Sequence, residues 1–452
     1  MVIIIGGGIT GLAAAHELTV RHVPFRLLEA RTRAGGLIRT ERVDGFTIDA
    51  GPDSILAQKP AGVALCDEVG LSDQLMPTTP PRTAFVLKHG RLHPLPARSV
   101  LGLPTTWRGL ASYSLLPPRA RARLAMEPWI ARRELPDESV GAFFRRRFGA
   151  ATVGLIAEPL LGGIHAGSID SLSLRSLFPR LADAEATRGS VLRAFRGGPR
   201  SPAGDGLFRS LTGGMETLVH AIEQRLPAGS VVYNAAAHAV AREGNQWRVD
   251  AGGTIAHGRA VLITAPAYVA SSLLAPVDSR AAALCAEVPY VSTVSIALGW
   301  PGTAIRHRLA GSGFVVARRH NCLRITACTW VSSKWTGRAP AGFALLRAFI
   351  GGAHDSEAIE LPDEELIAIA SRDLSGVLGI ITPPTLARVY RWRRAGAQHV
   401  VGQLARVREI SGCLSRHAGL HVAGSGFGAV GIPDCIADGR AAAIAAAQSI
   451  ET

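Results

Sequence analysis

The chain opens with a strand-like run that leads directly into a glycine-rich turn. Residues 2–5 are Val-Ile-Ile-Ile, and Gly6, Gly8 and Gly11 follow with the spacing G-x-G-x-x-G. A short apolar run of β-branched residues is typical of a buried parallel strand. Residues 12–18 have the composition of a helix. A strand, a glycine turn and a helix in this order predict an α/β fold with a parallel sheet.

The spacing of the glycines predicts a dinucleotide-binding site. Gly6 would permit the tight turn, Gly8 the approach of a pyrophosphate, and Gly11 the close packing of helix on strand. The helix N-terminus offers free N–H groups and the positive end of its dipole. A second strand, residues 25–28, ends just before Glu29. A carboxylate at that place can accept hydrogen bonds from ribose hydroxyls.

The residues after the second strand favour FAD over NAD. A nicotinamide-binding domain would continue with another regular strand and helix. Here Gly35-Gly36 is followed by residues 45–54, which hold a further glycine-rich stretch. Glycines let an extended segment pass close to a cofactor, an arrangement associated with flavoproteins. A turn that merely holds two glycines remains the alternative.

The other end of the chain supplies a second part of the predicted cofactor site. Residues 419–424 predict a strand that ends in glycine, and residues 426–431 again match G-x-G-x-x-G. We do not assign a second nucleotide-binding turn here, because Pro433 disfavours helical backbone at the residue before it. Asp434 is the expected N-cap of a terminal helix over residues 435–449. The dipole of that helix can stabilise negative charge on a reduced flavin ring.

Cofactor motifs at both ends predict a discontinuous FAD-binding domain of the Rossmann type, interrupted by insertions. Strand-like segments recur over residues 205–275 and 285–400, whereas residues 96–204 are helical in composition and rich in arginine. The predicted class is therefore α/β with an α+β insertion. We assign the FAD-binding domain to residues 1–80, 205–275 and 411–452, a mixed-sheet substrate domain to 81–97 and 276–410, and a helical domain, a candidate membrane-facing part, to 98–204.

The chain is strongly basic, with 49 lysines and arginines against 35 acidic residues and a net charge of +14. All but three of the basic residues are arginines, a skew that nucleotide bias in a genome also explains. A basic surface suits nucleic acid, an anionic membrane surface or acidic small molecules. Nucleic acid is the least favoured, because no recognisable binding module accompanies the charge.

Other sequence features exclude further classes of protein. The longest uncharged apolar stretch, residues 260–276, is interrupted by Pro266 and falls short of the ~20 residues that a membrane span needs. The apolar start of the chain has no basic leader or cleavage site, so we expect a cytoplasmic protein. The six cysteines form no C-x-x-C pair and have no histidine at metal spacing. We therefore expect reduced, mostly buried thiols and no metal site.

Several longer stretches resemble those of one family. They are GGGITGLAAA (6–15), EARTRAGGLIRT (29–40), DGFTIDAGPDSIL (44–56), EPLLGGIHAGSIDSLSLRSLFP (158–179), ITACTWVSSKW (325–335) and AVGIPDCI (429–436). With shorter matches they span essentially the whole chain, which resembles the FAD-dependent protoporphyrinogen and coproporphyrinogen oxidases of haem synthesis. The stretches at 158–179 and 429–436 are the most particular to these enzymes. The resemblance implies the domain architecture of p-hydroxybenzoate hydroxylase.

The resemblance also implies which positions contact FAD. Two of them depart from the family pattern. His238, at the adenine edge, stands where valine is expected, and Leu37 stands where lysine is expected. The implied cofactor positions are Gly6, Gly7, Gly8, Ile9, Thr10, Gly11, Glu29, Ala30, Gly35, Gly36, Leu37, Gly51, Pro52, Asp53, Ser54, His238, Trp392, Gly424, Val430, Gly431, Ile432 and Pro433.

In this family a porphyrinogen loses six electrons to FAD in three two-electron steps, and molecular oxygen reoxidises the flavin with release of hydrogen peroxide. The cofactor carries the chemistry at its N5 atom, so no catalytic side chain is assigned. The pocket needs apolar surface for the macrocycle and cations for its propionates. Gly163, Ile164, Ile325 and Phe349 match positions that line the substrate side in relatives.

The preferred porphyrinogen follows from weaker signals. Protoporphyrinogen enzymes often carry an arginine just before the aromatic residue that matches Phe85. Here Ala84 stands in that place, and Arg82 would lie two positions back on the same strand face. The residues of several motifs are closer to those of coproporphyrinogen-type enzymes. Coproporphyrinogen has four propionates and protoporphyrinogen has two, and the more acidic substrate suits a basic protein better. We therefore favour coproporphyrinogen III, with Arg82 as a candidate substrate contact and protoporphyrinogen IX as the alternative.

Three other functions stay open at this point. A flavin amine oxidase of the same superfamily commonly uses a lysine-bound water, and only Lys59, Lys88 and Lys334 are lysines here. A non-catalytic flavin- or porphyrin-binding protein could hand porphyrin to the next enzyme of the haem pathway. A basic helical insertion could also dock on the inner face of the cell membrane. The sequence gives no oligomeric state.

Overall fold

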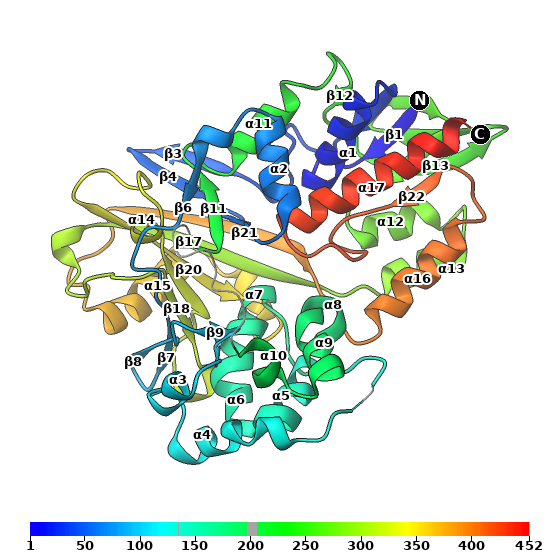
Figure 1. The fold of residues 1–452 in the computed structure, drawn as a ribbon. Coiled ribbons are helices and arrows are strands. Elements are labelled where there is room, and N and C mark those ends of the chain that lie inside the picture. The colour runs from blue at the N-terminus through cyan, green and yellow to red at the C-terminus, as the bar shows by residue number, and fades with distance from the viewer. Residues whose placement is uncertain (134, 197–205, 452) are drawn as a thin grey trace.

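The computed structural model describes residues 1–133, 135–196 and 206–451. Three regions are visible in Figure 1. A parallel sheet with its helices lies at the upper right, where both termini are found, a large mixed sheet lies at the left, and a group of helices lies at the bottom.

The first region is a five-stranded parallel sheet built from distant parts of the chain. Its strand order is β12 (Val231–Val232), β2 (Phe25–Leu28), β1 (Val2–Ile5), β16 (Ala260–Ile263) and β22 (Leu420–Val422). Val2 is paired with Phe25 on one side and with Ala260 on the other. The bounds of β1 and β2 are those predicted from the sequence. The motifs from the two ends of the chain therefore share one sheet.

Apolar residues of β1 alternate between the two faces of this sheet. Val2 and Ile4 pack against one group of helices, whereas Ile3 and Ile5 pack with Trp247 on the other face. The first face is covered by α1 (Ile9–Val20), α2 (Pro60–Glu68), α11 (Glu216–Glu223) and α17 (Ile432–Glu451). The second is covered by an antiparallel sheet of β13 (Ala237–Glu243), β14 (Gln246–Ala251) and β15 (Thr254–Gly258), and by α12 (Ala267–Leu274), α13 (Ser279–Ala286) and α16 (Gln403–Leu414).

The second region is a seven-stranded mixed sheet. Its order is β21 (Leu386–Ala397), β17 (Tyr290–Pro301), β20 (Phe343–Gly351), β19 (Ala327–Trp330), β18 (Gly313–Val316), β7 (Ala84–Lys88) and β8 (Arg91–Pro94). Strands β18 and β7 run parallel, and the other neighbours are antiparallel. One face packs on α15 (Asp363–Leu378). The opposite face packs on β4 (Phe46–Asp49), where Ser295 Oγ donates to the carbonyl of Ala50 over 2.8 Å.

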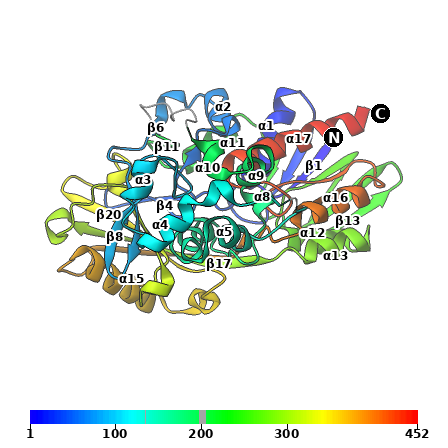
Figure 2. The same cartoon turned by 60° about the horizontal axis from the view of Figure 1, so that its bottom comes forward.

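The third region consists of short helices around an aromatic core, seen end-on in part in Figure 2. Phe143, Phe144 and Phe148 are buried there, and Arg147 forms a buried ion pair with Glu127. The helices are α3 (Trp107–Ala111), α4 (Pro118–Ala125), η2 (Glu127–Trp129), α5 (Val140–Phe148), α6 (Ala150–Thr152), the π-helical segment η3 (Val153–Gly162), α7 (Gly163–His165), α8 (Leu174–Leu177), α9 (Pro179–Arg188) and α10 (Val191–Phe195). The predicted domain boundary at residues 204 and 205 lies outside the described residues.

Smaller elements connect these regions. They are β3 (Thr40–Val43), which pairs with β4, the three-stranded sheet β5 (Ile55–Leu56), β11 (Phe208–Leu211) and β6 (Leu75–Pro77), the pair β9 (Ser99–Val100) and β10 (Leu103–Pro104), the helix α14 (Val331–Lys334), and the single turns η1 (Ser72–Gln74), η4 (Gly302–Ala304), η5 (Arg318–His320) and η6 (Ser356–Glu360).

The terminal helix starts earlier than the sequence predicts. Helix α17 begins at Ile432 and contains Pro433, so Asp434 lies in the first turn and is not the N-cap. Proline is tolerated there because the first N–H groups of a helix have no intrahelical partner. The Asp434 carboxylate instead accepts a hydrogen bond from the N–H of Val430 over 3.2 Å. The prediction that Asp434 is the N-cap was wrong. Its side chain nevertheless accepts a hydrogen bond from a backbone N–H just before the helix.

Two further expectations concern cysteines and membranes. All six cysteines are free, and five of them are buried while Cys322 is exposed. The expectation of unpaired, mostly buried thiols is confirmed. Within the described ranges, no helix has the length and apolar character that crossing a bilayer requires.

Candidate active site

The first glycine turn is shaped as its spacing predicts. Gly6 has φ of +108°, a conformation that side chains with a Cβ rarely adopt. A Cβ on Gly11 would lie 1.9 Å from the Gly6 carbonyl oxygen, so the helix can approach the strand only with glycine at this position. At Gly8, by contrast, no other part of the protein lies within 4 Å of where a Cβ would stand. The turn is therefore tight on its inner side and open on its outer side.

The second glycine pair lies against this open turn. The N–H of Gly35 donates to the carbonyl of Gly7 over 2.7 Å, and a Cβ on Gly36 would lie 3.2 Å from the Cα of Gly8. The first helical hydrogen bond of α1 runs from Leu12 to Gly8, so the preceding N–H groups lack helical acceptors. A pyrophosphate fits this cradle, because it needs free N–H donors and no intervening side chain.

Glu29 is held beside the turn by backbone groups. Its side chain is buried, and its Oε2 accepts from the N–H of Gly7 over 2.6 Å while Oε1 accepts from the N–H of Arg31 over 2.8 Å. Each carboxylate oxygen has two lone-pair sites, so both oxygens keep capacity for a ribose hydroxyl. This geometry agrees with the predicted role of Glu29, while Ala30 follows it at the surface.

The predicted adenine position falls on an irregular part of β13. The pairing of β13 with β14 shifts between Ala237 and Ala239 and leaves His238 without a partner in the register. A residue left out at a β-bulge keeps its backbone N–H and carbonyl unpaired by the neighbouring strand. Its side chain is exposed. His238 can therefore offer backbone groups at this edge whatever its side chain is.

Residues from three segments meet at the expected flavin end. A Cβ on Gly51 would lie 2.0 Å from the carbonyl oxygen of Leu37 and 3.6 Å from the ring of Trp392. The indole N–H of Trp392 donates to the carbonyl of Ala50 over 3.2 Å. Leu37 takes part through its backbone, which is consistent with leucine in place of lysine. The structure thus brings Leu37, Gly51 and Trp392 together.

The start of α17 lies against α2 and near the start of α1. Gly431 has φ of +81° and open space around it, and Pro433 lies against Gly62 of α2. A Cβ on Gly424 would lie 3.2 Å from the Thr10 side chain of α1. Helix α17 therefore places its N-terminus beside the first glycine turn, with Ile432 buried and Val430 in the preceding loop.

Asp53 lies in a buried cluster of charges. Its Oδ2 is 3.1 Å from Lys334 Nζ and 3.2 Å from Arg347 Nη2. Burial alone would raise the pKa of Asp53, but the charges of Lys334 and Arg347 outweigh it and hold the pKa far below the usual range. The carboxylate is thus ionised at all physiological pH values. Ser54 donates its hydroxyl to the same side chain over 2.9 Å, and Pro52 links Asp53 to Gly51.

A family model for flavin-containing amine oxidoreductases matches residues 9–447. The chain belongs to this family. The coproporphyrinogen III oxidase of Bacillus subtilis is 35% identical, over 98% of this chain and 96% of its own length. The protein of the same name from Propionibacterium freudenreichii is 32% identical over 97% and 89%. A crystal structure of a candidate protoporphyrinogen oxidase from Exiguobacterium is 30% identical and superposes with a TM-score of 0.88, covering 100% of this chain and 99% of its own.

For a flavin-containing amine oxidoreductase, the residues expected on the substrate side are only partly assembled. Phe349 is partly exposed on the face of β20 that looks toward the flavin end. Ile164 is 68% exposed and Gly163 has open space around it, so both are free to meet a ligand. Ile325 is fully buried in the core that packs on α15. The structure does not bring the Ile325 side chain together with Phe349.

Arg82 is not where the sequence predicts it. Strand β7 begins at Ala84, so Arg82 lies before the strand and shares no strand face with it. Its Nε donates to the carbonyl and to the hydroxyl of Thr78, each over 2.9 Å. The predicted strand position was wrong: β6 ends at Pro77, the prolines at 80 and 81 lie in the connection, and a proline has no N–H to donate to a strand ladder, so β7 begins only at Ala84.

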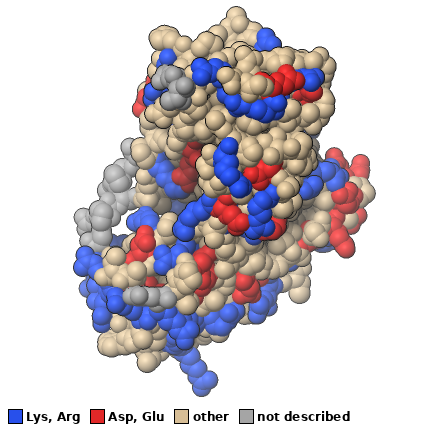
Figure 3. Space-filling view, turned by 90° about the vertical axis from the view of Figure 1, so that its right-hand side faces the viewer, with Lys and Arg blue, Asp and Glu red and all other residues tan. Residues whose placement is uncertain are grey.

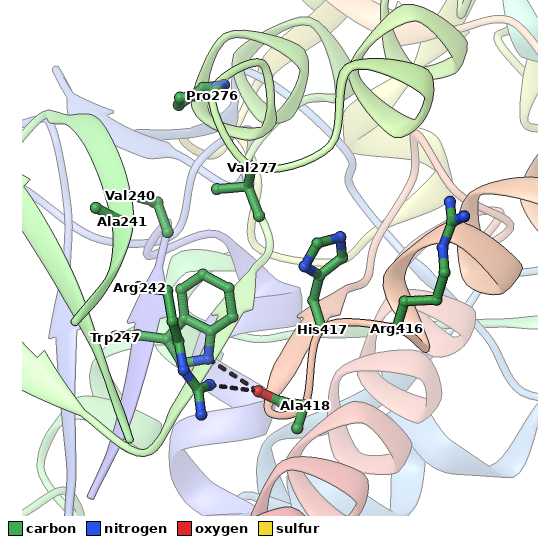
Figure 4. A pocket seen from close by; sticks show the side chains of 9 residues that line it. All are labelled: Val240, Ala241, Arg242, Trp247, Pro276, Val277, Arg416, His417 and Ala418. Carbon is green, nitrogen blue, oxygen red and sulfur yellow. Dashed lines mark hydrogen bonds between the residues drawn. The ribbon is translucent and has the colours of Figure 1, made fainter. Parts of the chain in front are cut away.

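A cavity of about 610 Å³ lies outside this flavin site. It opens between β14 and the loops after α12 and α16, and Figure 4 shows Trp247 and Arg242 both directed at the carbonyl of Ala418. Those hydrogen bonds span 3.0 and 2.9 Å. None of the predicted site residues lines this cavity, so it does not contribute to the site.

Sequence reasoning missed the arginine and lysine that surround Asp53. Arg347 and Lys334 come from β20 and α14, about 290 residues further along the chain than Asp53. A signal was present in the sequence, because Arg347 stands two residues before Phe349 and so faces the same side of a strand. Lys334 is also one of only three lysines in the chain. What the sequence lacks is the register that brings β20 over β4.

Proposed function

We propose that this protein is an FAD-dependent coproporphyrinogen III oxidase that converts coproporphyrinogen III to coproporphyrin III in haem synthesis. The observation that carries the proposal is similarity over nearly the whole chain to proteins of that name, up to 35% identical. Membership of the flavin-containing family supports an oxidoreductase. Protoporphyrinogen IX is the second candidate substrate, supported by the 30% identical structure from Exiguobacterium.

The proposed FAD site is discontinuous, as the p-hydroxybenzoate-hydroxylase-like architecture requires. In this proposal Gly8 and Gly36 cradle the pyrophosphate and Glu29 binds the ribose, because their surroundings are open and rich in backbone donors. Gly51, Trp392 and the start of α17 would flank the ring. The dipole of a 20-residue helix at that place favours negative charge on the ring. The residue boundaries of the domains remain part of the proposal.

FAD held by these residues would supply the electron acceptor for the six-electron oxidation, in which three hydrides and three protons leave the porphyrinogen and molecular oxygen takes the electrons on to hydrogen peroxide. The protein's own residues bind and orient the macrocycle and exclude water. Phe349 and Ile164 offer apolar surface to it. The three protons that leave the porphyrinogen balance those taken up when hydrogen peroxide forms, and we assign no side chain to carry them.

Partners and location follow as further parts of the proposal. The substrate is a porphyrinogen and the acceptor is molecular oxygen. We propose a cytoplasmic enzyme, and the net charge of +14 is consistent with contact with the inner face of the membrane. It is also consistent with transfer of the product to the next enzyme of the haem pathway.

Anaerobic mixing of the FAD-loaded enzyme with each substrate tests the proposal. We expect coproporphyrinogen III to bleach the flavin absorbance faster than protoporphyrinogen IX, and we expect fluorescent porphyrin and peroxide on admission of air. Amines serve as the comparison, because the family also includes amine oxidoreductases. The proposal is falsified if an amine reduces the flavin while both porphyrinogens leave it oxidised.

A further inference from the structure

We propose that Arg347 is a positioning residue that couples the flavin-contact segment Gly51–Ser54 to Phe349 on the substrate side. The inference rests on the proposed flavin site and deepens it. It concerns how two surfaces, one for the cofactor and one for the substrate, keep a fixed separation.

Arg347 holds the flavin-contact segment through several atoms of one guanidinium. The side chain is 5% exposed. Its Nη1 donates to the carbonyl of Gly51 over 2.7 Å and also to the carbonyl of Asp49. Its Nη2 lies 3.2 Å from Asp53 Oδ2. The planar guanidinium presents these donors in a fixed geometry, so the turn from Asp49 to Asp53 is fixed as one unit.

The same guanidinium contacts the aromatic ring on the substrate side. Arg347 and Phe349 are two residues apart on β20 and therefore face the same side of the sheet. The guanidinium carbon lies 5.0 Å from the centre of the Phe349 ring, within range of a cation–π interaction. Because Phe349 is only partly buried, it keeps surface for a ligand. A displacement of the ring would therefore be felt at Gly51.

Asp53 and Lys334 keep the guanidinium in place. Lys334 Nζ lies 3.1 and 3.3 Å from the two oxygens of Asp53, and the indole N–H of Trp335 donates to Oδ2 over 3.4 Å. The Asp53 carboxylate is thus anchored independently of Arg347. Loss of Arg347 would leave the charge of Asp53 paired with Lys334 while it released the carbonyls of Asp49 and Gly51.

A matched pair of substitutions separates positioning from stability. Arg347→Met removes the contacts with Gly51 and Phe349, whereas Arg147→Met removes another buried arginine, 0% exposed, whose ion pair with Glu127 lies in the helical region and touches no part of this segment. We expect both to lower the melting temperature. Only Arg347→Met should shift the visible absorption band of bound FAD and weaken FAD binding to the apoprotein by at least tenfold. Arg347→Lys, which keeps the charge, should fold and restore part of the affinity.

The coupling to Phe349 is tested by a double-mutant cycle on the FAD-saturated enzymes. We expect Arg347→Met and Phe349→Leu each to lower kcat/KM, and the double variant to lose less than the product of the two separate losses. Independent effects in this cycle would overturn the coupling. A normal flavin band and normal FAD affinity in Arg347→Met, or the same band shift in Arg147→Met, would overturn the positioning role. A wild-type protein that binds no flavin would instead overturn the proposed function.

Discussion

Two titratable residues near the proposed site have different surroundings. Glu29 accepts hydrogen bonds from two backbone N–H groups. His165 is the last residue of α7, and its ring lies 5.7 Å from that of Phe178. Burial is the main cause that lowers the pKa of His165 to about 4, and the charges of His399 and Lys59 lower it further. His165 therefore stays neutral at physiological pH.

Replacement of Glu29 by alanine should weaken FAD binding by ~1–3 kcal/mol, because charge-assisted hydrogen bonds are lost. Titration of the apoprotein with FAD, followed by quenching of flavin fluorescence, measures the change. Glu17→Ala on the outer side of α1 is the control, because Glu17 pairs with Arg21 of the same helix. Equal affinities for Glu29→Ala and Glu17→Ala would contradict the assigned role.

The histidine predicts how stability depends on pH. The unfolded chain binds a proton at His165 near pH 6.5, whereas the folded chain does so near pH 4. Between these values the unfolded state holds more protons, so stability falls as pH falls. In the wild type, His165 should account for a loss of about 2 kcal/mol in the free energy of unfolding between pH 7 and pH 5. We expect this loss to be absent in His165→Asn, as measured by urea unfolding at the two pH values. The exposed His354, changed to Asn, should leave the slope as it is. An unaltered slope in His165→Asn would exclude this residue as the cause.

Single elements meet in the proposed site at their ends. The C-terminal edge of the parallel sheet carries the turn after β1, where α1 begins, and α17 passes beside the start of α1. A Cβ on Gly439 of α17 would lie 2.2 Å from the carbonyl oxygen of Thr10, so the two helices cross almost in contact. This crossing explains how a helix at the end of the chain reaches the first glycine turn.

Two glycines of this turn should respond to alanine in opposite ways. Gly11→Ala places a Cβ against the Gly6 carbonyl, so we expect unfolding to be easier by about 3 kcal/mol. Gly8→Ala meets no neighbouring protein atom within 4 Å and has φ of −68°, which alanine adopts readily. Gly8→Ala should therefore keep its melting temperature but bind FAD about tenfold more weakly. Chemical unfolding and FAD titration of both variants measure the difference in stability and in FAD affinity. Equal free energies of unfolding for Gly8→Ala and Gly11→Ala would contradict this prediction.

The charge of the whole molecule is distributed unevenly. In the view of Figure 3, lysine and arginine side chains gather over the lower end, where α4 lies in Figure 1. Arg119, Arg132 and Arg133 of this region are exposed. Such a surface attracts anions over about one Debye length, ~10 Å at 0.1 M salt.

We expect the net charge to act on the rate of substrate capture. The kcat/KM for coproporphyrinogen III, with four carboxylates, should fall severalfold between ~20 and ~200 mM salt, and that for protoporphyrinogen IX, with two, should fall less. Steady-state fluorescence assays over this range measure both slopes, and a porphyrinogen methyl ester without charge is the control. Equal slopes for the two acids would show that capture does not depend on the summed charge.

The sequence by itself determined the local parts of this protein. The apolar run of β1, the glycine spacing and the helical composition after it act over a few residues, so their bounds and the shape of the turn at Gly6 and Gly11 could be predicted. Sequence similarity over the whole chain likewise indicated the family. Two boundaries near prolines, at Arg82 and at the start of α17, were predicted two or three residues away from where they lie.

Only the tertiary structure decided which distant residues meet. The contact of Arg347 with Gly51 joins positions 296 apart in the chain, and the placement of Ile325 in the core depends on how the mixed sheet packs on α15. Such contacts depend on strand register and on the packing of one layer against another, and no short pattern encodes them. The charge cluster around Asp53 could not be predicted for the same reason, because it depends on how the mixed sheet packs on β4.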